Sequence, residues 1–226
     1  MRAIKYHGGV EVADLAKENM KALEVGIANL DRHIDNVRDV FGLPCLVAIN
    51  HRADDSEAEL RWLTDRAIHH GVKVLVARHY AEGGAGAIEV AKEVVGLCEQ
   101  PNYFKFVYED SATLWDKMKA VATRIYGASE VTADSKVRAR IRQLQDAGYG
   151  HYPVCVAKTQ YSFSTDPKLR GAPTGHSVNI REVRLAAGAE FLVMICGDIM
   201  TMPGLPAVPA ANNIDVDDDG RITGLF

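Results

Sequence analysis

The stretch from Pro44 to Asn50 reads Pro-Cys-Leu-Val-Ala-Ile-Asn, an apolar run of strand length that ends in a polar residue. A run without alternating polar positions predicts a strand that is covered on both faces. A second such run, from Val72 to Arg78, follows after a segment long enough for a helix. Two buried strands separated by a helix predict a parallel pair, because parallel strands need a crossover connection.

The segments around the first strand carry helix signals. Apolar residues recur at three- and four-residue steps from Ala13 to Phe41, which predicts a long amphipathic helix. Ser56 and Glu59 have the spacing of a capping box, in which Ser56 accepts from the Glu59 N–H and the Glu59 side chain reaches back. We expect the helix that begins there to run to His70.

The alternation of strands and helices continues along the chain and then gives way to strands divided by Gly- and Pro-rich stretches. We expect a helix over 86–99, a third strand over 104–109, helices over 111–126 and 134–147, strands over 153–159, 178–185 and 191–197, and a loop-rich tail over 202–226. The predicted fold class is α/β: a parallel sheet flanked by helices, followed by a smaller strand- and loop-rich α+β domain. A soft boundary falls near residue 150.

Composition narrows the class of protein. The 226 residues are 47% hydrophobic and 25% charged, as in a globular domain with a sizeable core. A net charge of -4 gives no electrostatic footprint for nucleic acid or an anionic membrane, and neither is expected as a partner. No apolar run is long enough to span a bilayer, and we expect a cytoplasmic protein. The four cysteines lack the spacing of a zinc site, so no metal ligands are predicted.

Polar residues gather where the predicted strands end. The carboxyl ends of parallel strands meet at one edge of a sheet, where ligands bind. Two arginines, two histidines, an aromatic ring and several carboxylates would suit a polar heteroaromatic ligand that carries acid groups. Asp54 and Asp55 have the alternative role of helix-start residues favoured by the helix dipole. The residues concerned are Asn50, His51, Arg52, Asp54, Asp55, Arg78, His79, Tyr80, Glu82, Glu109 and Asp110.

Three further segments resemble functional motifs. The Gly-rich turn over 81–87 could hold an anion on its N–H groups, but the chain contains no Gly-Lys dipeptide and therefore no P-loop. Residues 215–220 match the first half of a calcium loop, but Phe226 stands where the bidentate Glu belongs, so an acidic turn before a short strand is predicted. The polar segment from Lys158 to Ser162 fits a structural and a ligand-binding role equally well on residue type.

Several blocks, in order along the whole chain, resemble formate-tetrahydrofolate ligases (10-formyltetrahydrofolate synthetases). The first block, Arg2 to Gly9, is similar to the end of a signature of that family, and the chain closes on the similar block Thr223 to Phe226. Between them lie Asn29-Leu30 with His33-Ile34, Gly42 to Pro44, Val47 to Asn50, Glu57 to Leu60, Ala81 to Gly84, Ala157 to Ser164, Arg181 to Arg184 and Ile199 to Pro206.

The resemblance implies an activity and a missing part. Such enzymes join formate to N10 of tetrahydrofolate while ATP becomes ADP and phosphate, through formyl phosphate. The family's ATP and Mg²⁺ site lies upstream of where this chain starts, so a P-loop-bearing N-terminal ligase chain is the expected partner and the isolated chain is expected to be inactive. Residues 1–12 are then a remnant of the nucleotide domain, 13–150 an α/β domain with the folate or pterin pocket, and 151–226 a C-terminal α+β domain.

The resemblance also implies which residues bind. The family stacks the pterin ring between a Phe and a Trp, at positions that match Arg52 and Tyr80, and the family's next residue, Pro, is Ala53 here. A guanidinium plane and a phenol ring can still stack on a heteroaromatic ring. The expected folate-side residues are Asn50, Arg52, Ala53, Asp55, Tyr80 and Glu82; those beside the nucleotide base are Pro173, Gly175, His176 and Ser177; Lys158 and Gln160 are further pocket residues.

Three functions fit this sequence. One is the C-terminal chain of a split ligase with tetrahydrofolate or a related pterin as substrate. The second is a fragment of a single-chain ligase. The third, from a different class, is a non-catalytic folate- or pterin-binding or scaffold protein derived from the enzyme. Members of the family assemble as homotetramers, so an oligomer is expected.

Overall fold

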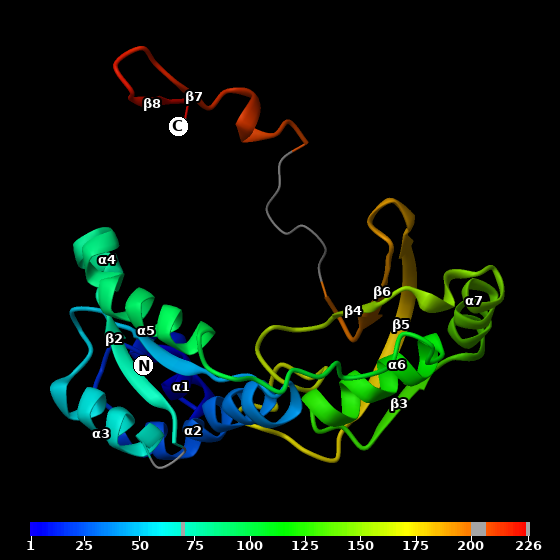
Figure 1. Cartoon of the computed structure of the whole chain (residues 1–226), viewed down its shortest axis with the longest axis horizontal. Coiled ribbons are helices and arrows are strands. Elements are labelled where there is room, and N and C mark those ends of the chain that lie inside the picture. Colours follow the sequence, from blue (N-terminus) through cyan, green and yellow to red (C-terminus); the bar gives the residue numbers. More distant parts are fainter. Residues whose placement is uncertain (69–70, 200–206, 225–226) are drawn as a thin grey trace.

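A computed structural model describes residues 1–68, 71–199 and 207–224, and its α/β architecture confirms the predicted fold class (Figure 1). Two units lie side by side along the longest axis. The helices are α1 (Arg2–His7), α2 (Met20–Asp35), α3 (Glu57–Ile68), α4 (His79–Glu82), α5 (Ile88–Cys98), α6 (Leu114–Ala120) and α7 (Ser135–Asp146). The strands are β1 (Leu46–Asn50), β2 (Lys73–Ala77), β3 (Glu130–Ala133), β4 (Val154–Ala157), β5 (Ser177–Ala186), β6 (Phe191–Cys196), β7 (Asp215–Val216) and β8 (Ile222–Thr223).

The first unit is built on the two strands that were predicted first. β1 and β2 pair in parallel, with Leu46 opposite Lys73 and Asn50 opposite Ala77, and α3 connects them. The predicted parallel pair with a helical crossover is therefore confirmed. The core of this unit draws one or more side chains from each of α1, α2, α3 and β1, namely Ile4, Leu23, Ile27, Ile49, Leu60 and Leu63.

Helix α2 begins later than predicted. Its apolar stripe is correct, since Leu23, Ile27 and Ile34 are buried. However, the helix starts at Met20 rather than near residue 13, because the side chain of Asn19 caps it by accepting from the Ala22 N–H at 3.0 Å. An amphipathic pattern carries no information about where a cap interrupts it.

Two glycines let α1 lie directly on α2. A Cβ at Gly8 would lie 1.9 Å from the Ala22 carbonyl oxygen, and one at Gly26 would lie 1.9 Å from the Ile4 carbonyl oxygen. Any larger residue at either position would therefore force the backbones apart. Gly26 lies within the continuous helix α2, where the glycine permits the close crossing.

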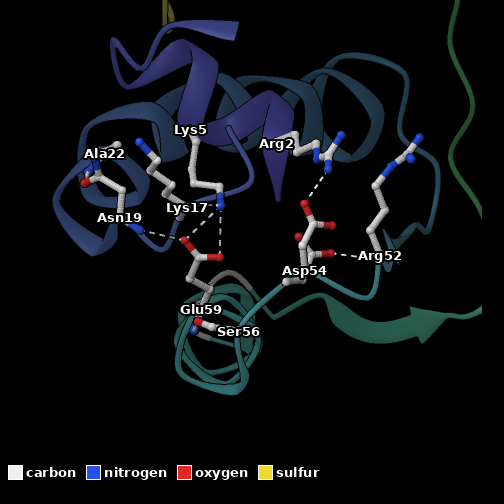
Figure 2. A network of polar contacts seen from close by, with 10 residues as sticks. Arg2, Lys5, Lys17, Asn19, Ala22, Arg52, Asp54, Ser56 and Glu59 are labelled. Carbon is white, nitrogen blue, oxygen red and sulfur yellow. Dashed lines mark hydrogen bonds and ion pairs between the residues drawn. The ribbon is translucent and has the colours of Figure 1, made fainter. Parts of the chain in front are cut away.

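A buried ion pair fastens α1 to the start of α3 (Figure 2). The side chains of Lys5 and Glu59 are fully buried and lie 3.1 Å apart. Lys5 also donates to the Lys17 carbonyl at 3.0 Å, and Glu59 accepts from the Asn19 N–H at 2.8 Å. Half of the predicted capping box is correct, because Ser56 accepts from the Glu59 N–H at 3.2 Å. The prediction that the Glu59 side chain reaches back to the start of its own helix was wrong. The buried carboxylate pairs with the Lys5 ammonium instead, because a buried charge needs a counter-charge.

The second unit is a mixed sheet with strand order β3-β5-β6-β4. β3 pairs with β5 and β4 with β6 in parallel, whereas β5 and β6 are antiparallel. Helices α6 and α7 pack on this sheet through Leu114, Met118, Ile141 and Leu144. Strand β3 was not predicted, because it has only four residues and one buried residue, Val131.

The third predicted strand, over 104–109, is absent from the first sheet. The N–H groups of Tyr103 and Lys105 donate instead to the carbonyls of Gly42 and Phe41, at 3.0 and 3.1 Å. Phe104 and Phe106 remain exposed. An aromatic, alternating segment favours a strand only where another strand offers its edge, and here the turn after α2 takes those hydrogen bonds.

The core of the second sheet extends further toward the N-terminus than residue 150. Its buried residues run from Leu114 to Cys196, so α6, β3 and α7 share a core with β4, β5 and β6. The division of the chain at residues 12 and 150 stays a prediction about domains. Among the helices of the described ranges, none has the length and apolar character needed to cross a bilayer.

The C-terminal part that the structure describes, 207–224, holds a short hairpin. Strands β7 and β8 are antiparallel, and the Asp217 carboxylate in their turn accepts from the N–H groups of Asp219 and Arg221 at 3.0 and 2.8 Å. The predicted acidic turn before a short strand is confirmed. Of the predicted block from Ile199 to Pro206, residues 200–206 lie outside the described residues, as do residues 225–226.

We expect Glu59→Gln to destabilise the chain by about 3 to 5 kcal/mol, because the Lys5 ammonium would stay buried without its counter-charge. Urea unfolding followed by circular dichroism measures this. Asp14→Asn is the matched control, since it removes an exposed partner of Lys17 and should leave the midpoint unchanged. An unfolding curve of Glu59→Gln that overlays the wild type would contradict the proposed importance of the buried pair.

Candidate functional site

The ends of β1 and β2 meet as predicted. Asn50 lies opposite Ala77, and the His51 N–H donates to the Ala77 carbonyl at 3.0 Å. The two loops that follow the strands therefore begin side by side. Across them, the Nη1 of Arg78 lies 3.4 Å from the Nδ1 of His51. Polar side chains from two separate sequence segments thus share one edge of the sheet.

Arg52 and Tyr80 are in direct contact at this edge. The Cζ of Arg52 lies 4.9 Å from the centre of the Tyr80 ring, and the Tyr80 side chain is 71% exposed. A flat ring sandwiched between them would need about 7 Å, two van der Waals separations of about 3.5 Å. The pair must therefore open before a ring can enter between the two side chains.

The loop between β1 and α3 is held by its carboxylates (Figure 2). Asp54 pairs with Arg2 of α1, and the Arg2 guanidinium, chiefly through its hydrogen bond, lowers the pKa of Asp54. Asp55 accepts from the backbone N–H of Arg52 at 2.9 Å. Because Ser56 supplies the cap of α3, these two aspartates fix the loop rather than the helix end. The loop that carries Arg52 is thereby positioned from both sides.

The remaining folate-side residues predicted at this edge lie in solvent. The predicted place of Glu109 and Asp110 at the same edge was wrong, because the segment before them forms no strand of this sheet. Ala53 is exposed, and Glu82 is the exposed last residue of α4. The Gly-rich turn after it forms a 3₁₀ helix over Gly83–Ala87 and folds back, since the Arg78 N–H donates to the Gly86 carbonyl at 2.9 Å. A Cβ at Gly86 would lie 2.5 Å from the Arg78 carbonyl carbon. The glycine therefore serves this close approach of the backbone.

A second cluster of polar side chains lies between the two units. It surrounds a cavity of about 290 Å³ and brings together residues from α1, α2, the end of the π-helical turn Val121–Ile125 and the segment after β4. Lys158 and Gln160 were predicted as pocket residues. Thr159 and Ser162 belong to the polar segment from Lys158 to Ser162, for which a structural and a ligand-binding role were both predicted. His7, Asn29, His33 and Phe163 were not predicted as pocket residues, although they fall within the blocks that resemble the family. The full lining is His7, Asn29, His33, Tyr126, Lys158, Thr159, Gln160, Ser162 and Phe163.

Lys158 is the cation of this cavity. Its Nζ donates to the Thr159 carbonyl at 3.1 Å and to the Ser162 carbonyl, and it lies 4.8 Å from the centre of the Tyr126 ring. Burial lowers the pKa of Lys158 to about 8 because it disfavours the ammonium form. Burial likewise raises the pKa of Tyr126 to about 12, so this phenol stays neutral beside the lysine.

The histidines around the cavity are kept neutral. Burial is the main cause that lowers the pKa of His7, His33 and His176, and the Lys158 ammonium lowers the pKa of the last two further. The Nδ1 of His7 accepts from the Gly171 N–H at 3.1 Å. A neutral His7 ring therefore carries its proton on Nε2 and has a donor to offer.

The residues predicted beside the nucleotide base form the entry to β5. The Gly175 N–H donates to the Gly127 carbonyl, and the His176 carbonyl accepts from the Ser129 N–H, both at 2.9 Å. Ser177 is the first residue of β5, and Pro173 lies two residues before Gly175. Of the four, His176 has a pKa that the Lys158 charge lowers, so His176 belongs with the second cluster rather than with the ends of β1 and β2.

Comparison with known proteins agrees with the sequence blocks. The family model described as formate--tetrahydrofolate ligase matches residues 1–226. The chain is 61% identical over 230 residues to the formate--tetrahydrofolate ligase of Methylibium petroleiphilum and 59% identical over 227 residues to that of Methylococcus capsulatus. Both comparisons cover 100% of this chain and 41% of the relative. The chain therefore spans less than half the length of these curated relatives.

We expect Lys158 to titrate with a pKa of about 8 in the folded chain. Side-chain NMR of ¹³C-labelled lysine, assigned with Lys158→Arg, measures this value directly. Spectra of Lys158→Arg, which lack the Lys158 signals, are the control. If the Lys158 signals instead titrate near pH 10.4, the value of an unperturbed lysine side chain, burial does not shape this cavity as described.

Proposed function

Since this chain belongs to the formate-tetrahydrofolate ligase family, we propose that it supplies the folate side of such a ligase. A P-loop-bearing N-terminal part, separate from this chain, would supply the ATP chemistry. The contact of Arg52 with Tyr80 at the strand ends carries the proposal. It places two groups that can stack on a ring at the edge where parallel sheets bind their ligands. Tetrahydrofolate or a close pterin relative is the proposed substrate.

Binding begins with the opening of this pair. The pterin ring would replace the Tyr80 ring as the neighbour of the Arg52 guanidinium, so the attraction between the two side chains is exchanged for a similar attraction to the ligand. Tyr80 is exposed and free to rotate away, whereas the Arg52 backbone is fixed by Asp55. Tyr80 therefore moves and Arg52 stays.

The chemistry requires two parts. ATP activates formate as formyl phosphate, and N10 of the folate then attacks the formyl carbon while phosphate leaves. Charge that develops on the phosphoryl oxygens calls for Mg²⁺ and cationic groups around a P-loop, which would belong to the N-terminal part. The task of this chain is to hold the folate with N10 directed at the formyl group.

An exposed apolar surface supports the need for a partner. The side chains of Tyr103, Phe104 and Phe106 are 84%, 48% and 75% exposed on the segment between α5 and α6. Beside them lies an apolar groove of about 620 Å³ that includes Phe41, Val121 and Ile125. Monomeric proteins seldom leave contiguous apolar surface of this kind bare. We propose that the rest of the ligase docks on this surface. We also propose that the assembled protein forms an oligomer.

Tetrahydrofolate should bind the isolated chain, and both Arg52→Ala and Tyr80→Ala should weaken the binding by about three- to tenfold, the worth of one stacking contact. Isothermal titration calorimetry measures the affinities. Tyr80→Phe keeps the ring and should bind like the wild type. Arg142→Ala, which removes an exposed side chain of α7, controls for loss of positive charge. Equal affinity for all of these variants would place the pterin elsewhere.

Addition of the N-terminal part should produce 10-formyltetrahydrofolate in a reaction that depends on ATP and formate. Phe106→Asp should weaken association of the two parts by about 30-fold, because a buried aromatic anchor is worth about 2 kcal/mol. Val12→Asp is the matched control, since Val12 is 72% exposed and does not line this groove. Tight pterin binding that is indifferent to any partner, with no turnover, would support a binding protein instead.

A further inference from the structure

The cavity between the two units has the composition of an anion site. Its described lining contains a lysine and two histidines, and none of those residues is acidic. The chain as a whole carries a net charge of -4, so this local excess of basic groups runs against the average. A cavity of about 290 Å³ admits only a small group.

The charge of Lys158 has no counter-charge among the described residues. Its two hydrogen-bond partners are backbone carbonyls, which orient the ammonium without neutralising it. Lys117 offers a comparison, because it too donates to two carbonyls, those of Gly150 and Tyr152, at 2.8 and 3.0 Å. Lys117 is completely buried, whereas Lys158 lines an open cavity. Only Lys158 can therefore receive an anion from solution.

Neutral donors surround the same space. The His7 ring presents an Nε2–H, because its Nδ1 accepts from Gly171. Asn29 uses one of its two amide N–H groups on the Gly171 carbonyl at 2.9 Å, which leaves the other free for a ligand. Gln160 adds an exposed carboxamide. A cation with several N–H donors is the combination that recognises an oxyanion.

We propose that this cavity binds a small oxyanion of the carboxylate or phosphate class, with Lys158 as its charge partner and His7 and Asn29 as donors. The site is separate from the strand ends where the pterin is proposed to stack. It therefore does not rest on the pterin assignment, and either can fail alone. In a ligase of this family the anion has two kinds of source, a free reactant such as formate or phosphate, or a carboxylate on the glutamyl tail of the folate.

The proposal makes the affinity depend on pH in a defined direction. The pKa of Lys158 is lowered to about 8, so the ammonium is lost as the pH rises through that value. His7, His33 and His176 have lowered pKa values and are neutral throughout this range. Burial raises the pKa of Cys196, a thiol that the Lys158 charge also affects, to about 12. It raises the pKa of Tyr126 to about 12 as well, so neither group ionises in this range. Anion affinity should fall about tenfold between pH 7 and pH 9.

Three anions distinguish the sources. The intact chain is titrated with formate, inorganic phosphate and N-(4-aminobenzoyl)-glutamate while the lysine side-chain NMR signals are followed. Because formate is small, we expect its dissociation constant to be no lower than about 1 mM. A response to formate or phosphate alone identifies a free reactant, and a tighter response to the glutamate compound identifies the folate tail. Absence of binding by all three anions overturns the proposal.

Variants of Lys158 separate binding from structure. Lys158→Gln should weaken binding of the anion at least tenfold at pH 7. The remaining affinity should not change with pH up to pH 9. Lys158→Arg should restore the affinity but not the pH dependence, because arginine keeps its charge. Lys119→Gln, an exposed lysine on α6, should bind like the wild type. If Lys158→Gln does not fold, the Lys158→Arg profile decides, because a slope equal to that of the wild type would contradict a role for Lys158.

Discussion

The buried pair of Lys5 and Glu59 is the interaction on which the arrangement of the first unit depends. It joins α1 to the first turn of α3, and through Lys17 and Asn19 it also fixes the start of α2. Two charges in a fully buried place are costly unless both stay paired and hydrogen-bonded. Because α3 follows directly on the loop after β1, the same pair sets the position of the loop that carries Arg52.

Helix α1 connects the two clusters of polar residues. Arg2 at its start pairs with Asp54 beside the strand ends, and His7 at its end lines the cavity between the units. Arg2 and His7 are five helical steps apart, which is only about 7.5 Å along the helix axis. A shift of α1 would therefore reach both places at once. This geometry would couple the two proposed sites, the pterin ring at the strand ends and the anion in the cavity.

The sequence predicted what depends on local pattern and missed what depends on partners. The strands β1 and β2, the stripe of α2 and the cap at Ser56 follow from periodicity and residue type, and all of them are present. The partner of Glu59 lies 54 positions away, and the hydrogen bonds that draw residues 103–105 to the turn at Phe41 are equally remote in sequence. His7 and His33 became candidates only when folding brought them to Lys158. Arg52 and Tyr80 were foreseen as neighbours, but not as a closed pair.

The most direct measurement is of intermolecular nuclear Overhauser effects between tetrahydrofolate and the side chains of Arg52 and Tyr80 in the isolated chain. The account predicts such effects from the pterin protons to both side chains, together with separation of the Arg52 and Tyr80 side chains as the ring enters. Effects from the pterin that are confined to other residues, with the Arg52 and Tyr80 pair still closed, would contradict the assignment of the folate side to these strand ends.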